Sequence, residues 1–287
     1  MFNRLLRPLG RDLRASLDDD INESRLAPPS AAADPVRDAD LADLPHAVQR
    51  YLHFMGVVGR PRDVSFRAHF RGRFRMRPGQ HFMPCEVWQY DSVEIARLFH
   101  MRIDCAGFVP MVGRDSYVRG HGRMRGKLLG IVTVADGQGP KFDIGELSTY
   151  LNDAVLLAPS MLLTTGVTWA AVDNTSFDVS LTDAGRTATA RVFLDERGAP
   201  RDFSTSDRFA ALPGGLVRAE WTTPVSGWTT VDGRSMPTRG AAVWHLPEGE
   251  FTYAEFTFEP DSIEYNAVAT RYQYSDASSR SGTPPAP

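Results

Sequence analysis

The stretch VSFRAHFRGRFRMR, residues 64–77, alternates between two kinds of residue without a break. Every second position from Val64 to Met76 is apolar or glycine, and the positions between carry serine, histidine or arginine. Because successive side chains of a β-strand point to opposite faces, this pattern predicts a long strand with an apolar face and an arginine face. Similar alternation, or a run that is apolar on both faces, predicts further strands at 97–105, 112–126, 128–134, 176–181, 188–194, 234–246 and 250–265.

Helical signals stand before and within this series of strands. Pro45 suits the first turn of a helix and Gly56 its C-terminal end, with an apolar stripe between them. Asp143 and Glu146 have the spacing of a capping box, and a short second helix is expected after Pro159. We therefore expect a mainly β (α+β) fold, in which a single curved antiparallel sheet of about ten or eleven strands forms an open half-barrel. An N-terminal helix and a helical insertion after the fifth strand are expected to pack in its concave side.

Composition divides the chain into three parts. Residues 1–42 are expected to form an amphipathic segment and a flexible linker, residues 43–274 the half-barrel domain, and residues 275–287 a disordered tail. Within residues 1–14, leucines lie largely opposite arginines, which is typical of helices that lie on anionic membrane surfaces. A proline and a glycine interrupt that helix, so a leader that docks on the domain is the alternative.

Charge and motif content exclude several classes of function. The formal net charge of −3 gives no drive toward nucleic acid, and aromatic residues do not interleave with the arginines of residues 64–77. The seven histidines lack the short spacings of zinc ligands, so no metal is expected, and no motif indicates a cofactor. Cys85 and Cys105 are expected to be free thiols, although a cross-strand disulfide stays open as an alternative.

Hydropathy bears on the expected location. No uninterrupted apolar core of a secretory signal is present, and the longest apolar stretch, 154–163, is too short to cross a bilayer. We expect a cytoplasmic protein, with peripheral contact with the inner membrane through residues 1–14 as the alternative.

Five segments are similar to a bacterial family known only as a domain of unknown function. They are LPHAVQRYLHFMG (44–56), GRDSYVRGHGRMRGKLLG (113–130), FDIGELSTYLNDAVLLAPSMLL (142–163), VDGRSMPTRGAAVW (231–244) and FTYAEFTFEPDSIEYN (251–266). The resemblance covers residues 43–266, and that family supplies no catalytic residues.

The order of elements also resembles the half-barrels of lipoprotein-localisation proteins and mycobacterial lipid carriers, an analogy of architecture. In those folds a curved sheet wraps around helices, and the apolar space between them holds acyl chains. The resemblance therefore implies an apolar ligand site.

The residues themselves indicate where such a site would lie. The inner face of the first strand and the inserted helices offer an apolar lining: Phe66, Phe70, Phe74, Leu151, Val155, Met161 and Leu162. Concave apolar surfaces with a few polar groups are the usual form of small-molecule pockets, so these residues predict binding of an apolar or lipid-like molecule.

Two other functions stay open. An enzyme could use the same cavity with Glu86, His100 and Asp115 as acid and base, although no nucleophile and base stand in a recognisable motif. A structural or interaction protein would instead fill the space between sheet and helices with its own side chains. Unfilled room between these elements distinguishes a ligand-binding protein from the last alternative.

Overall fold

The computed structural model describes residues 13–24, 26, 34–105, 109–129, 132–212 and 214–267. The first strands are β1 (Ser65–Phe74), β2 (Met83–Ser92), β3 (Ala96–Cys105), β4 (Val109–Val118), β5 (His121–Leu128) and β6 (Val132–Gln138). The later strands are β7 (Val167–Asp173), β8 (Ser176–Asp183), β9 (Arg186–Leu194), β10 (Pro200–Thr205), β11 (Phe209–Leu212), β12 (Gly215–Arg218), β13 (Glu220–Thr222), β14 (Val225–Ser226), β15 (Thr229–Val231), β16 (Arg234–Met236), β17 (Arg239–Leu246), β18 (Gly249–Thr257) and β19 (Ile263–Tyr265). The helices are α1 (Leu13–Ser24), α2 (His46–Phe54) and α3 (Pro140–Leu157), with short 3₁₀ turns η2 (Asp38–Leu41), η3 (Pro159–Leu162) and η4 (Pro260–Ser262).

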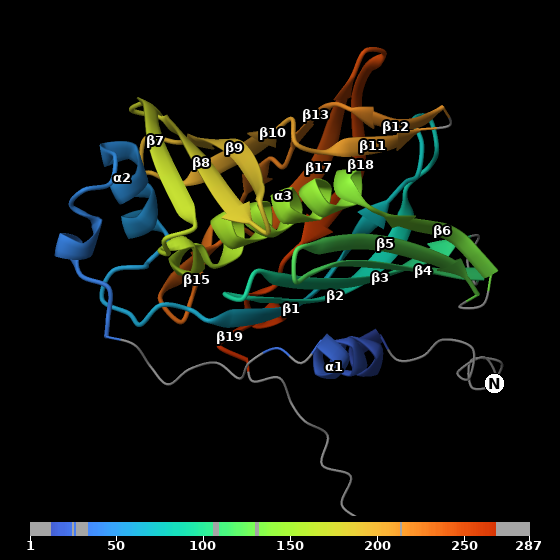
Figure 1. Ribbon diagram of the computed structural model, residues 1–287, viewed down its shortest axis with the longest axis horizontal. Coiled ribbons are helices and arrows are strands. Elements are labelled where there is room, and N and C mark those ends of the chain that lie inside the picture. Colours follow the sequence, from blue (N-terminus) through green and yellow to red (C-terminus); the bar gives the residue numbers. More distant parts are fainter. Residues whose placement is uncertain are drawn as a thin grey trace, which may run out of the picture.

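Within the described residues, fifteen strands form one antiparallel sheet. Its main path is β6-β5-β4-β3-β2-β1-β18-β17-β13-β10-β9-β8-β7, with β14 paired to β17 and β19 to β1. The two arms of the sheet curl toward each other around α3 (Figure 1). The predicted open half-barrel with a helical insertion on its concave side is confirmed.

Strand β1 stands at the junction of the two arms. It pairs with β2 along its whole length, but with β18 only from Arg71 to Phe74. Phe66 and Phe70 are buried on the concave side, whereas Arg71 and Arg73 are exposed, as the alternation of this segment predicts. The remaining outer edge of β1 is covered by β19.

Several local predictions are wrong. Residues 128–134 do not form one strand, because β5 ends at Leu128 and β6 begins at Val132. Residues 112–126 form the β4–β5 hairpin rather than one strand, because Arg119 and Gly120 take positive φ values of 52° and 78°, as tight hairpin turns require. The helical insertion consequently follows the sixth strand. Helix α3 begins with Pro140 in its first turn, and Asp143 does not cap it; its carboxylate accepts the backbone N–H of Gly122 at 2.8 Å.

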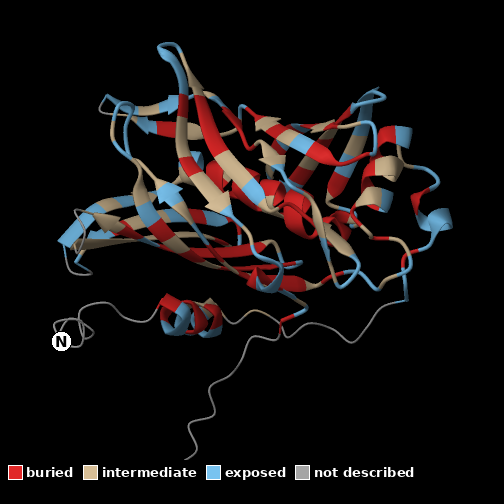
Figure 2. Cartoon of the chain, turned by 180° about the vertical axis from the view of Figure 1, so that it is seen from behind, coloured by how far each residue is buried: buried red, intermediate tan, exposed pale blue. Residues whose placement is uncertain are grey.

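Helix α3 lies at the centre of the core. Its buried residues occur on every side of the helix, because both arms of the sheet enclose it (Figure 2). Helix α2 closes one end of the half-barrel against β7 and β8, where the ring of Tyr51 lies 5.2 Å from that of Phe177. The hydroxyl of Tyr51 donates to the carbonyl of Val155 in α3 at 2.7 Å, which ties the two helices together.

Helix α1 packs on the opposite, convex face of the sheet (Figure 1). Leu17 and Ile21 form a small second core with Tyr90 and Leu98 of β2 and β3. An ion pair of 2.6 Å between Asp18 and Arg67 flanks it. Of the predicted amphipathic segment 1–14, only the last two residues are described, and most of the predicted linker and all of residues 275–287 lie outside the described residues.

Both cysteines are free, as expected, and burial raises the pKa of the Cys85 thiol to about 12. No helix in the described part of the chain is long and apolar enough to cross a membrane.

Candidate ligand cavity

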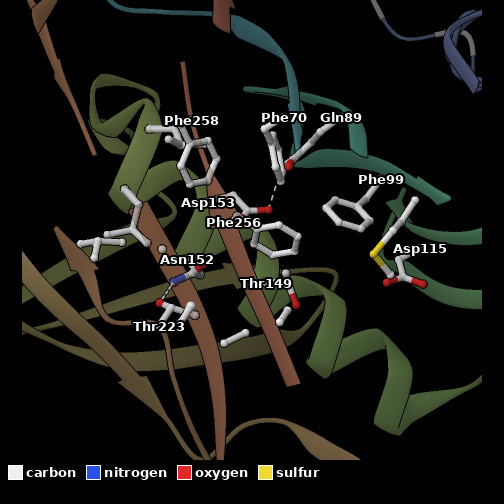
Figure 3. A pocket seen from close by; sticks show the side chains of 18 of the residues that line it. Phe70, Gln89, Phe99, Asp115, Thr149, Asn152, Asp153, Thr223, Phe256 and Phe258 are labelled. Carbon is white, nitrogen blue, oxygen red and sulfur yellow. Dashed lines mark hydrogen bonds between the residues drawn. The ribbon is translucent and has the colours of Figure 1, made fainter. Parts of the chain in front are cut away.

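A cavity of about 130 Å³ lies between the concave face of the sheet and α3 (Figure 3). Its apolar walls come from β1, β3, β14, β18, the residue that follows β18 and the last turn of α3: Phe70, Phe74, Phe99, Met101, Leu156, Leu157, Val225, Tyr253, Phe256 and Phe258. Phe70 is central to this wall, with its ring centroid 5.1 Å from that of Phe256 and 4.7 Å from that of Phe258. The volume is close to that of an apolar protein cavity that admits benzene.

The space stays open because small residues face it from two neighbouring strands. Gly240, Ala241 and Ala242 of β17 and Ala254 of β18 line the cavity, and Ala242 pairs directly with Ala254. A side chain of at most one methyl group does not reach across to α3. Interiors are otherwise close-packed, so this run of small residues is what creates the room.

One end of the cavity is polar. Arg97 of β3 donates from Nε to Asp153 at 2.7 Å and from Nη1 to Glu146 at 3.1 Å, which holds α3 to the sheet. Gln89 of β2 donates to Asp153 at 2.7 Å and to Asp91 at 3.0 Å. On the other side, Asn152 donates to the hydroxyl of Thr223 (Figure 3).

Burial perturbs the carboxylic acids of this end. Loss of hydration and, to a smaller extent, the charge of the nearby Asp115 raise the pKa of Glu146 to about 7. Burial likewise raises the pKa of Asp91 and of Asp115. The neighbouring Arg97 opposes each of these shifts, because its charge favours the ionised acids. The polar end therefore holds at least part of a proton at neutral pH.

Two charged side chains of the cavity have no hydrogen bond or ion pair with any described residue. They are Asp115 of β4 and Arg208, which precedes β11. The guanidinium of Arg208 instead lies over the ring of Trp221, with Cζ 4.1 Å from the centroid. Both groups are thus free to contact a bound molecule.

The structure places the predicted ligand-binding residues in two groups. Phe70 and Phe74 line the cavity. The other five, Phe66, Leu151, Val155, Met161 and Leu162, are buried in the core away from it. The reason is helical geometry: α3 presents Thr149, Asn152, Asp153, Leu156 and Leu157 to the cavity, and Leu151 and Val155 lie on another side of the helix.

The predicted acid and base residues are not brought together. Only Asp115 faces the cavity, because it pairs with the inward-facing Phe99. Glu86 and His100 have the opposite strand parity and lie on the convex side. There Glu86 contacts His69 at 2.8 Å, while His100, 1% exposed, bonds to Asp20 of α1 at 2.9 Å.

Sequence reasoning missed Arg208, Arg97 and the polar stripe of α3. The signal for the stripe was present, since Thr149, Asn152 and Asp153 recur at helical spacing within an otherwise apolar segment. Among the described residues, no group of three histidine, cysteine or acidic side chains is arranged to hold a metal ion.

These features define an open half-barrel with an internal, partly polar cavity. The chain belongs to the family of unknown function DUF6544, whose model matches residues 34–256. The expected resemblance to a family of unknown function is therefore confirmed. No curated protein matches the chain.

Solved structures are similar in fold at low sequence identity. A domain assigned to the outer membrane lipoprotein-sorting proteins, from Vibrio parahaemolyticus, is 10% identical, with 70% of this chain and 85% of that chain covered and a TM-score of 0.39. A LolA superfamily protein from Nitrosomonas europaea is 12% identical, covering 76% and 91%, with a TM-score of 0.38. A DUF1329 family protein from Desulfovibrio piger is 15% identical, covering 81% and 94%, with a TM-score of 0.40.

Proposed function

We propose that this protein binds a small apolar, lipid-like molecule in the cavity between the sheet and α3. The observation that carries the proposal is unfilled space of about 130 Å³ with aromatic walls. Water in this space finds few hydrogen-bond partners on the aromatic walls, so an apolar molecule that displaces it is favoured by the hydrophobic effect and by its contacts with the walls.

The same observation bears on the two alternatives. A purely structural protein gains nothing from small residues at Ala242 and Ala254, where larger side chains would complete the core. An enzyme needs an acid and a base within reach of one substrate, and of the three candidates only Asp115 faces the cavity. Binding without chemistry is the function that the geometry supports best.

Filling the cavity from within is expected to abolish binding. In Ala242→Leu, three additional carbon atoms enter the cavity, so toluene, a probe of suitable size, should bind at least about tenfold more weakly than to the wild type. Binding is measured by ligand-detected NMR titration of the full chain. The melting temperature should hold or rise, because leucine fills a void.

The matched control is Ala171→Leu, which makes the same change at an exposed position of β7. It should bind toluene as the wild type does. Unchanged toluene binding in a folded Ala242→Leu protein, or no binding by the wild type, contradicts the proposed site.

A further inference from the structure

The polar end of the cavity holds more carboxylic acids than guanidinium groups. Four carboxylic acids interact around it, Asp91, Asp115, Glu146 and Asp153, against the two guanidinium groups of Arg97 and Arg208. Asp91 is fully buried, and its Oδ2 has no hydrogen-bond partner among the described residues. Burying acids in this excess is costly unless protons or a cation compensate them.

The contacts within this cluster leave Asp115 as the acid that a ligand can reach. Arg97 is engaged by Asp153 and Glu146, and both N–H groups of the Gln89 amide are taken by Asp91 and Asp153. Asp115 lines the cavity beside Phe99, with which it pairs, and accepts no hydrogen bond from a described residue (Figure 3). The carboxylate of Asp115 is half-buried, and without a donor it can accept a hydrogen bond from a group that enters the cavity.

The positive charge of Arg208 would favour an anionic ligand rather than a cationic one. Its guanidinium is also without an acceptor, but it lies over Trp221 at 4.1 Å and within 5.5 Å of Trp244, so its charge is partly met by aromatic faces. An anion beside Arg208 would also lie near Asp115 and be repelled by its carboxylate. The two residues are close enough that the charge of Arg208 lowers the pKa of Asp115. The surplus of acids therefore favours a cation at this end.

We propose that the molecule bound in the cavity is a primary amine with an apolar tail, whose ammonium group donates to the carboxylate of Asp115. This inference rests on the proposed function and adds the class of ligand. The tail occupies the space beside Phe70, Phe256 and Phe258, and the ammonium lies at the polar end, beside Asp115. The ammonium group compensates the buried acids in place of a proton.

Four probes that share one ring test the proposal on the full chain at pH 7.5. Toluene reports the apolar cavity, and benzylamine, benzyl alcohol and benzoate add a cationic, a neutral and an anionic head. Benzylamine should bind at least about tenfold more tightly than benzyl alcohol, the gain expected of a hydrogen bond to a charged group, and benzoate most weakly.

Three variants assign the preference to its residue. Asp115→Asn should remove the difference between benzylamine and benzyl alcohol and leave toluene binding unchanged. Arg208→Gln should leave benzylamine binding unchanged or tighter, because it removes a repelling charge. Asp261→Asn, at an exposed position of η4, is the control for net charge and should change none of the affinities.

The outcomes separate the two proposals. The amine proposal is overturned if benzylamine and benzyl alcohol bind equally tightly. It is also overturned if benzoate binds most tightly of the four probes and loses that advantage in Arg208→Gln. In either case the proposed apolar site is retained if toluene binds. Failure of the wild type to bind toluene overturns the proposed function itself. An amine preference that persists in Asp115→Asn shows that Asp115 does not hold the head group and overturns the assignment.

Discussion

Replacing Arg97 by methionine is expected to lower the free energy of unfolding by about 3–5 kcal/mol, the usual cost of removing one partner from a buried charge cluster. The Arg97 side chain is 5% exposed and contacts Glu146 and Asp153, so its loss leaves buried acids without a cation. Urea denaturation at pH 7.5 measures the change. The loss should shrink at pH 5, because protonation then neutralises the unpaired acids.

Arg191→Met provides the matched control. Arg191 pairs with Asp178 on the outer surface, with side chains 45% and 32% exposed, and its loss should cost less than about 1 kcal/mol. If the two variants lose the same small amount of stability, Arg97 does not compensate buried charge, and the electrostatic account of the cavity is wrong.

Raising the pH from 4.5 to 8 is expected to reduce stability by about 3 kcal/mol through Glu146 alone, at about 1.4 kcal/mol for each unit of pKa shift. The pKa of Glu146 is raised from 4.5 to about 7 by burial, so the folded protein keeps a proton that the unfolded chain releases. This stabilisation is complete below pH 4.5, declines as the pH rises, and is lost above about pH 7.

Chemical denaturation of Glu146→Gln across this pH range checks the assignment. The amide oxygen of glutamine still accepts from Arg97, but the side chain does not titrate, so the decline should flatten. Glu264→Gln, an exposed control on β19, should keep the wild-type pH dependence. Parallel curves for the wild type and Glu146→Gln mean that Glu146 ionises as an ordinary acid and that the cavity end is not as described.

The fold was predictable because its strands carry their own signal. The alternation in β1 fixes which residues face inward, and burial of Phe66, Ala68 and Phe70 follows it. The β4–β5 hairpin was missed because alternation continues across its turn; only the positive φ values of Arg119 and Gly120 separate the two strands. A pattern of period two therefore predicts which face of the sheet a residue lies on better than it predicts where a strand begins or ends.

The site was predictable only in part. The sequence of a helix that is buried on every side does not show which side faces a cavity. The apolar stripe with Leu151 and Val155 therefore gave a wrong prediction of the lining, which comes from another stripe of the helix. The contact of Arg97 with Glu146 joins a strand to a helix that follows three strands later, and only the curl of the sheet brings them together. Arg208 precedes a short hairpin without a periodic pattern to indicate where it points.

Mass spectrometry of organic extracts from gently purified protein tests most directly whether the cavity between sheet and α3 holds a ligand. The account predicts a small apolar compound with an amine group, present in near-equal molar amount with the wild-type chain and depleted in Ala242→Leu. An extract without any such compound, or equal amounts from both proteins, contradicts it.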